Sequence, residues 1–435
     1  MRFARPVSRS AVAAGGAALA VAVAGGIVIA ATHGSGSGDQ KVGAGSQHLP
    51  PASLALHERH GRLAYAEPIR FSVRNGVLTA VNLHEPNGTA VAGTYNVRHT
   101  EWRSQTALGP TLSLTGQVSY ADLAHHSTTV PISTRTADAP HQLEALLSPG
   151  GGDTVGVGSP VVVTFNYPIP NSLRATIERR LSVTTSPSVV GAWHWMSDQE
   201  VHWRPPAYWK TGTKVTIASD LQGIHVGKKI WALPERHQTS FKVGPSHISI
   251  ANVATDQMSV YDNGKLIRTL PFSGGRSQYP TKNGVHIAIE KSPSVIMDSA
   301  TVGIPKGSPG YYYETVYWDV RISDGGAFVH AAPWSVADQG HTNVSHGCIN
   351  LSPANAEWFY NWALRGDIVD VINSAAAVDR SDPGMADWNY SWKQWLKGDA
   401  APTAAAKHLH PKLLPEQHEP GMHPVVHHKK HKHHG

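Results

Sequence analysis

The sequence predicts a mainly β protein with several domains, and three observations lead to that prediction. Only 16% of the 435 residues are charged, whereas glycine and proline are plentiful. Short runs of alternating apolar and polar residues outnumber helical patterns. The length allows two to four domains that each bury a core. We therefore expect two immunoglobulin-like β-sandwiches, then a third β-rich unit with a short helix and a Trp-rich C-terminal segment.

The N-terminus is typical of an export signal. Arg2, Arg5 and Arg9 precede an uncharged stretch of mostly Ala, Val, Gly and Ile at residues 11–31, which is the order of regions in a signal peptide. The stretch is longer than the usual apolar region of about 7–15 residues and reaches the roughly 20 that span a bilayer. Residues 1–32 are therefore either a cleaved signal or a membrane anchor, and we expect the rest of the chain to be extracytoplasmic.

The first sandwich is expected at residues 54–147. Strand patterns at residues 69–73 and 77–81 flank an Asn-Gly pair that begins at Asn75, which predicts a tight hairpin. With further runs such as residues 111–120, the segment has the many short, turn-bounded strands of an immunoglobulin-like domain.

The second sandwich is expected at residues 148–244, after a boundary at three consecutive glycines. Asn171 or Ser172 is expected to cap a short helix at residues 173–180. The strand patterns lie at residues 161–167, 189–195, 200–203 and 214–218.

The third unit is expected at residues 245–374. Residues 293–320 are rich in Gly, Pro and Tyr, and such a stretch between strands predicts a lid over a site. A helix at residues 354–365 is expected to begin after Ser352-Pro353 and to end at a glycine. The strand patterns lie at residues 248–252, 258–261, 266–272, 285–290 and 368–372, with an Asn-Gly turn at residues 263–264.

The Trp-rich segment, residues 375–398, carries Trp388, Trp392 and Trp395 at the spacing i, i+4, i+7. This spacing predicts one helical face packed against a preceding domain.

Two segments lack apolar periodicity. Residues 33–53 predict a flexible linker. Residues 399–435, which hold nine of the 27 histidines and five lysines against two glutamates and one aspartate, predict a disordered basic tail. A metal-collecting tail, a polycation and a solvated segment without function are all compatible with this composition. The net charge of +6 favours anionic wall polymers or lipid head groups as neighbours, whereas the lack of a basic stripe with aromatics argues against nucleic acid.

Cys348 is the only cysteine. Exported proteins that use cysteine structurally have an even number for disulfides. The sequence therefore predicts a free thiol that is kept for its reactivity, rather than a disulfide partner or a buried inert thiol.

A nucleophilic cysteine needs a base and an oxyanion site. His330 ends an apolar strand 18 positions before Cys348 and is the predicted base. The amides of His346, Gly347 and Cys348 are predicted to form the oxyanion hole, because glycine permits the turn that this requires. His346 and His341 are the competing candidates for the base.

The motif consists of His330, a gap of 14 residues, and the run Ser345-His346-Gly347-Cys348-Ile349-Asn350. It closely resembles the signature of the L,D-transpeptidases, whose catalytic domain is of the YkuD type. The segments 328–335, 340–343 and 296–299 resemble the mycobacterial-type branch of this family. Two immunoglobulin-like modules before the catalytic domain and the Trp-rich segment after it fit the same branch, so that the resemblance covers most of residues 50–398.

The resemblance implies Cys348 as nucleophile and His330 as general base, oriented by the main-chain carbonyl of Ala331. Where the related lid pattern carries an aromatic residue, this chain has Val302. The remaining implied pocket residues are Ser345, His346, Gly347, Asn350 and Trp334, with Met297 and Tyr312 as substrate-contacting residues of the lid.

The resemblance also implies the reaction. Cys348 would attack the diaminopimelate–D-Ala bond of a peptidoglycan stem tetrapeptide and release D-Ala, and a second diaminopimelate amine would resolve the thioester into a 3→3 cross-link. Water in place of the amine would make the enzyme an L,D-carboxypeptidase. No cofactor or metal is implied, and carbapenems would acylate Cys348. A wall-binding protein without activity and a sortase are the alternatives; the intact Ser-His-Gly-Cys run argues against both.

Overall fold

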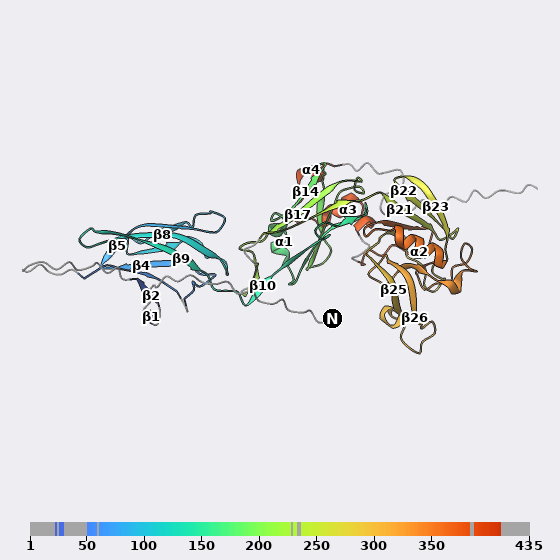
Figure 1. Cartoon of the computed structure of the whole chain (residues 1–435), viewed down its shortest axis with the longest axis horizontal. Helices are drawn as coiled ribbons and strands as arrows, with labels where there is room; N and C mark the ends of the chain where they lie inside the picture. The colour runs from blue at the N-terminus through green and yellow to red at the C-terminus, as the bar shows by residue number, and fades with distance from the viewer. Residues whose placement is uncertain are drawn as a thin grey trace, which may run out of the picture. The chain divides into compact units, whose positions relative to one another are not determined.

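The computed structural model describes residues 22–23, 26–29, 50–58, 61–227, 229–232, 236–382 and 387–409. The chain divides into two compact units. The first comprises Met1–Gln142 and Lys229–Pro234, and the second comprises Leu143–Lys228 and Glu235–Gly435. Strands dominate both units (Figure 1), which confirms the predicted fold class. Across the described ranges, no helix is long and apolar enough to cross a membrane.

The first unit is built from two sheets that enclose a core of Phe71, Trp102, Leu114 and neighbouring apolar residues. Its strands in sheet order are β1 (Ala22–Val23), β2 (Gly26–Ile29), β3 (Ser53–Leu56), β4 (Arg70–Arg74), β7 (Glu101–Ser104) and β6 (Gly93–Tyr95) in one sheet, and β5 (Gly76–His84), β8 (Ser113–Asp122) and β9 (Ser127–Arg135) in the other. Strands β1 and β2 fall inside the predicted targeting segment, most of which lies outside the described residues.

The hairpin predicted at Asn75 is wrong. Strand β4 pairs with β3 and β7, whereas β5 pairs with β8 in the other sheet. Asn75 has a φ of 54°, and this left-handed residue carries the chain from one sheet to the other. An Asn-Gly pair therefore marked a sharp turn correctly, but the sequence did not reveal that the next strand crosses the core.

The second unit begins with a sandwich of two four-stranded sheets. The predicted helix is α1 (Asn171–Glu178), but Pro170 precedes it and no side chain caps it, so the predicted cap at Asn171 or Ser172 is wrong. The strands are β11 (Ala145–Ser148), β13 (Val161–Phe165), β16 (Glu200–Arg204) and β15 (Ala192–Trp195) in one sheet, and β12 (Thr154–Val155), β20 (Arg236–Val243), β17 (Lys214–Asp220) and β14 (Leu181–Ser186) in the other. Three short strands, β10 (His141–Leu143), β18 (His225–Gly227) and β19 (Ile230–Ala232), occur where the chain passes between units.

The rest of the second unit has two sheets around one core. A five-stranded sheet has the order β23 (Lys265–Pro271), β22 (Gln257–Asp262), β21 (His247–Asn252), β29 (Ile368–Ile372) and β24 (Gly284–Ile287). A four-stranded sheet has the order β25 (Glu290–Asp298), β26 (Tyr313–Arg321), β27 (Phe328–Ala331) and β28 (Ile349–Leu351). Helix α2 (Pro353–Trp362) buries Ala356 and Phe359 in this core. It begins at Ser352-Pro353 as predicted, where Ser352 Oγ accepts from the Asn355 amide, but it ends at Trp362 and not at residue 365.

The predicted lid is mostly a β-hairpin. Strands β25 and β26 pair antiparallel from Glu290↔Arg321 to Asp298↔Tyr313, and the short 3-10 helix η1 (Ser299–Val302) and a loop join them. Pro293 is tolerated in β25 because this is an edge strand, whose outward amide has no partner to lose. Of residues 293–320, only residues 303–312 form the irregular loop that the Gly, Pro and Tyr content predicted.

The C-terminal segment packs on the second sandwich. It consists of η3 (Asp387–Asn389), α3 (Trp392–Trp395), η4 (Leu396–Gly398) and α4 (Ala404–Lys407). Its three tryptophans do not share one helix, because Ser391 begins α3 with a capping box, yet all three are buried around the guanidinium of Arg204 of β16. Helix α4 lies inside the segment predicted to be disordered from residue 399, because the fully buried Ala406 anchors it.

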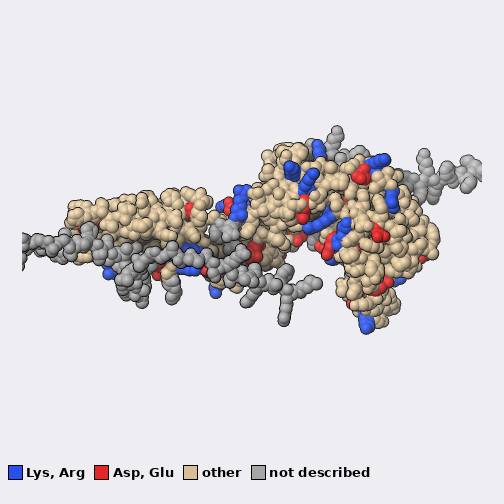
Figure 2. All heavy atoms as spheres, viewed as in Figure 1, with Lys and Arg blue, Asp and Glu red and all other residues tan. Residues whose placement is uncertain are grey.

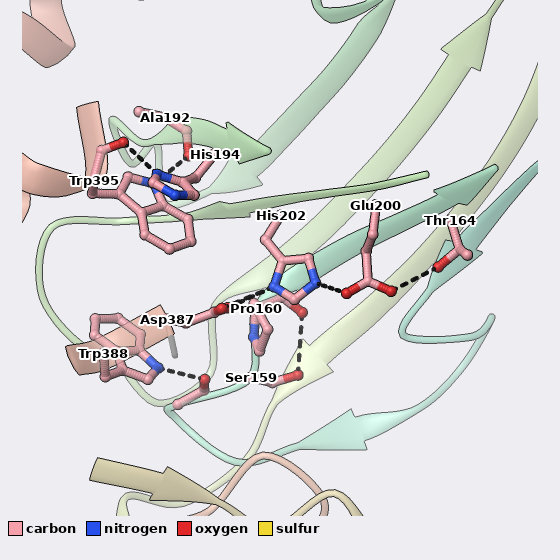
Figure 3. A network of polar contacts seen from close by, with 11 residues as sticks. Ser159, Pro160, Thr164, Ala192, His194, Glu200, His202, Asp387, Trp388 and Trp395 are labelled. Carbon is pink, nitrogen blue, oxygen red and sulfur yellow. Dashed lines mark hydrogen bonds and ion pairs between the residues drawn. The ribbon is translucent and has the colours of Figure 1, made fainter. Parts of the chain in front are cut away.

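A buried polar network holds this segment in place (Figure 3). His202 of β16 donates from Nδ1 to Asp387 Oδ1 and from Nε2 to Glu200 Oε1, each at 2.8 Å. Trp388 Nε1 donates to the Gly158 carbonyl and Trp395 Nε1 to the Ala192 carbonyl. Burial lowers the pKa of His202, but the charges and hydrogen bonds of Asp387 and Glu200 outweigh it and raise the pKa to about 10. His202 is therefore a buried cation.

Candidate active site

Strands β27 and β28 bring His330 and Cys348 onto one face of a sheet. The strands are parallel, with His330 opposite Asn350, and Cys348 directly precedes β28. Side chains alternate between the faces of a strand. The side chains that face the core are those of Val329, Ala331, Ile349 and Leu351. The alternate residues, His330, Cys348 and Asn350, therefore share the opposite face.

The thiol and the imidazole are both buried and neutral. Cys348 is 6% and His330 3% exposed. Burial raises the pKa of the Cys348 thiol to about 11, although the hydrogen bond from the Phe328 amide partly lowers this pKa. Burial lowers the pKa of His330 to about 4, although the hydrogen bond to the Ala331 carbonyl partly raises this pKa. At neutral pH the pair is thus thiol and imidazole rather than thiolate and imidazolium.

The main-chain carbonyl of Ala331 orients the imidazole. His330 Nδ1 donates to the Ala331 oxygen at 2.9 Å, which leaves the Nε2 lone pair available as a proton acceptor. The Trp334 ring, in η2 (Pro333–Ser335), lies 6.2 Å from the His330 ring between centroids and is 53% exposed. Trp334 therefore borders the imidazole at the protein surface.

A tight turn presents Cys348. Ser345 Oγ donates to the Cys348 carbonyl at 2.7 Å, and the Gly347 amide donates to Ser345 Oγ at 3.1 Å. Gly347 has a φ of 120°, a conformation that residues with a Cβ rarely adopt. Of the three amides predicted for the oxyanion hole, that of Gly347 is thus already engaged within the turn.

His346 lies between two tyrosine rings. Its ring centroid is 5.0 Å from that of Tyr279 and 4.7 Å from that of Tyr312. Arg276 Nη2 donates to His346 Nε2 at 2.6 Å. Burial and the Arg276 charge lower the pKa of His346, against a bond to the Gly310 backbone, which raises it. His346 is therefore a neutral wall of the site that also contacts the loop between β25 and β26.

A cavity of about 630 Å³ opens beside Cys348. Tyr312, His346 and Gly347 line it together with Val302. A second cavity, of about 490 Å³, is lined by Met297 and Phe328 and shares Val302, Tyr312, Gly325 and Gly326 with the first. Met297, Tyr312 and Phe328 also pack with Cys348 in one apolar cluster.

Asn350 and His341 differ in their surroundings. Asn350 is buried beside His330, where its Nδ2 donates to Ser335 Oγ at 3.2 Å. His341 is exposed, makes a 3.1 Å hydrogen bond with Thr342 Oγ1 and lines neither cavity. Of the candidate bases, only His330 therefore has a buried position on the face of the nucleophile.

Sequence reasoning missed Arg276 and Tyr279. They lie about 70 residues before the nucleophile, and an isolated bridge between Gly275 and Ser345 brings them to it. Two consecutive glycines before Arg276 were the only local signal. In the described part of the chain, no group of three or more His, Cys, Asp or Glu side chains is arranged to hold a metal ion.

Two family models match the chain: a bacterial Ig domain over residues 61–225 and an L,D-transpeptidase catalytic domain, YkuD, over residues 246–371. L,D-transpeptidase 2 of Mycobacterium tuberculosis is 38% identical over 77% of this chain and 81% of the relative. L,D-transpeptidase 5 of the same species is 33% identical over 78% and 75%. A crystal structure of L,D-transpeptidase 3 from that species is 34% identical over 53% of this chain and 99% of that chain, with a TM-score of 0.45.

An immunoglobulin-like region followed by a YkuD-type catalytic domain is the class of protein that these matches define. The resemblance read from the signature around Cys348 is confirmed. The chain belongs to the L,D-transpeptidase family.

Proposed function

We propose that this protein is a peptidoglycan L,D-transpeptidase that forms 3→3 cross-links with Cys348 as its nucleophile. The observation that carries the proposal is the buried face on which β27 and β28 bring His330 next to the turn of Cys348, at the edge of a cavity of about 630 Å³. A thiol in such a place is accessible to a bound peptide and shielded from bulk water.

In the first step, the Cys348 sulfur attacks the carbonyl carbon between diaminopimelate and the terminal D-Ala. The thiol proton passes to His330 Nε2 as the sulfur–carbon bond forms, and the carbonyl electron pair moves onto oxygen. The amides of Cys348 and His346 stabilise that oxyanion, since the Gly347 amide donates to Ser345. His330 then protonates the departing D-Ala amine, and a thioester remains.

In the second step, the side-chain amine of another diaminopimelate attacks the thioester. His330 takes a proton from the amine as the new amide bond forms, the carbon–sulfur bond breaks, and His330 returns the proton to the departing sulfur, which restores the Cys348 thiol. The two cavities that meet at Tyr312 and Val302 give the donor and acceptor stems separate places. Water in place of the amine gives the L,D-carboxypeptidase reaction.

The domain organisation fits an extracytoplasmic enzyme of the cell wall. We propose the divisions 54–147, 148–244, 245–374 and 375–398 as two spacer modules, the catalytic domain and its C-terminal support. In the view of Figure 2, basic and acidic side chains are interspersed over the described surface. On its composition of lysine and histidine, we assign contact with anionic wall polymers to the basic tail, and contact with the membrane to the N-terminal segment if it is retained.

Intact mass spectrometry of the wild type and Cys348→Ala tests this proposal. Each protein is incubated with imipenem, a carbapenem, and separately with a disaccharide-tetrapeptide. We expect a covalent adduct and release of D-Ala for the wild type alone, with cross-linked dimers as the product. Adduct formation by Cys348→Ala, or neither reaction in the wild type, would contradict the proposal.

A further inference from the structure

Asp319 is a buried carboxyl that lies across the sheet from the proposed base. The register between β26 and β27 shifts between Tyr317 and Val320. Two residues of β26, Trp318 and Asp319, therefore lie opposite one residue of β27, His330. Such a bulge re-aims side chains and is found next to active sites.

The bulge separates its two side chains. Trp318 has a φ of 58°, which is costly for a large residue, and its ring packs on Tyr360 of α2 with the centroids 5.4 Å apart. Asp319 is only 1% exposed, and neither of its oxygens has a hydrogen bond of ordinary geometry with any residue described, although the Val295 amide acts weakly on its charge. A buried carboxyl without such partners is costly and calls for an explanation.

The surrounding charges leave Asp319 uncompensated. Lys291 of β25 donates to the Ala363 carbonyl, and Arg321 of β26 donates to the carbonyls of Ser323 and Asp324. Glu314 of β26 is half-buried and Glu357 of α2 is exposed. No cation is paired with Asp319 among the described ion pairs.

The charge of Asp319 acts on the Cys348 thiol. Burial raises the pKa of Asp319 to about 7, against the Val295 amide, which lowers it. The charges of Asp319 and Glu314 in turn raise the pKa of the Cys348 thiol beyond the effect of burial. Asp319 thus lies within electrostatic reach of the sulfur and changes its charge in the neutral range.

The reacting pair needs such a charge. A base with a pKa of about 4 and a thiol with a pKa of about 11 are poorly matched for proton transfer. A neighbouring negative charge stabilises an imidazolium and opposes a free thiolate. The negative charge therefore favours proton transfer to His330 when the sulfur bonds to carbon in the same step, because no free thiolate then forms.

We propose that Asp319 is a positioning residue of this active site, whose carboxylate stabilises the imidazolium that His330 becomes when it takes the thiol proton of Cys348. The proposal rests on the function proposed above. Asp319 itself gains and loses no proton in the step: the proton moves from Sγ to Nε2, the sulfur–carbon bond forms, and the carbonyl electron pair moves to oxygen.

Two rate measurements against pH test the proposal in the full chain. Alkylation by iodoacetamide reports the thiolate fraction of Cys348, and acylation by imipenem reports the base-assisted attack. Both are measured between pH 5.5 and 9 for the wild type, Asp319→Asn and the control Glu314→Gln, which removes the more exposed of the two carboxylates.

We expect the two rates to move in opposite directions in Asp319→Asn. At pH 8 alkylation rises about tenfold for each unit by which the thiol pKa falls, whereas acylation slows by about tenfold or more, within the range of general-base effects. The wild-type rise of acylation through about pH 7 is absent in Asp319→Asn and kept in Glu314→Gln. A merely loosened site raises alkylation without removing that inflection, which would overturn the proposal.

An acylation profile of Asp319→Asn that matches the wild type would overturn it as well. Failure of the proposed function is distinguishable, because the wild type would then form no acyl adduct while the alkylation rates would still report the effect of Asp319 on the thiol.

Discussion

Two buried histidines of the second unit, His202 and His330, have opposite charge states. Both are almost inaccessible to water, at 4% and 3% exposure. His202 has a carboxylate on each ring nitrogen, and its pKa is raised to about 10. His330 has one carbonyl partner, Ala331, and its pKa is lowered to about 4.

The difference shows that partners decide what a buried histidine does. Burial disfavours the charged imidazolium in both places. Two carboxylates reverse this at His202 and make it a fixed cation that joins the C-terminal segment to the sandwich. At His330 the neutral ring keeps a lone pair on Nε2, which a base requires.

The largest expected effect is on the chemistry of His330. In His330→Gln, acylation of Cys348 by imipenem is expected to slow by about 10²–10⁴-fold, because the proton acceptor is lost. Stopped-flow or mass-spectrometric rates measure this. The matched control is His341→Gln, which changes an exposed histidine outside both cavities and should keep the wild-type rate. If acylation were slow in His341→Gln and normal in His330→Gln, His341 and not His330 would be the general base.

The next largest effect is on stability. His202→Gln leaves Asp387 and Glu200 buried or half-buried without their cation, and breaking such a pair costs about 3–5 kcal/mol. Urea unfolding followed by tryptophan fluorescence is suited to this measurement, because Trp388 and Trp395 report on the segment. An unchanged midpoint would mean that the segment is held by apolar packing alone.

The two histidines also predict opposite pH dependences of stability. The pKa of His202 is raised on folding, so its contribution is present below its ordinary pKa of 6.5 and is lost as pH rises toward about 10. The pKa of His330 is lowered, so its contribution is present above 6.5 and is lost as pH falls toward about 4. The difference in unfolding free energy between wild type and each Gln variant, measured from pH 4 to 10, should show these slopes; slopes of the same sign would contradict the comparison.

The smallest effect concerns the turn before the nucleophile. In Gly347→Ala the added Cβ meets nothing closer than the Tyr279 carbonyl at 3.8 Å, but a φ of 120° costs a residue with a side chain about 1–3 kcal/mol. We expect slower acylation with little change in the unfolding midpoint of the C-terminal segment. As a control, Gly212→Ala alters another positive-φ glycine with open space around it, in the second sandwich and outside both cavities, and should acylate normally.

The sequence predicted much of this arrangement because its signals were local. Cys348, Gly347 and His330 lie in a short motif, and strand β29 was located to the residue at 368–372. Contacts between distant segments left no such signal. Arg276 reaches His346 across 70 residues, Asp387 reaches His202 across 185, and the bulge at Asp319 appears only in the register of paired strands. The same limit explains the missed sheet change at Asn75.

The most direct test of the account is ¹⁵N NMR of the histidine rings at pH 7, with His330→Gln and His202→Gln used to assign the two signals. We expect His330 to be neutral with its proton on Nδ1 and His202 to be protonated on both nitrogens. If His330 instead carried both protons in the resting enzyme, the site would hold a thiolate–imidazolium pair, and the claim that its proton moves only during attack would be wrong.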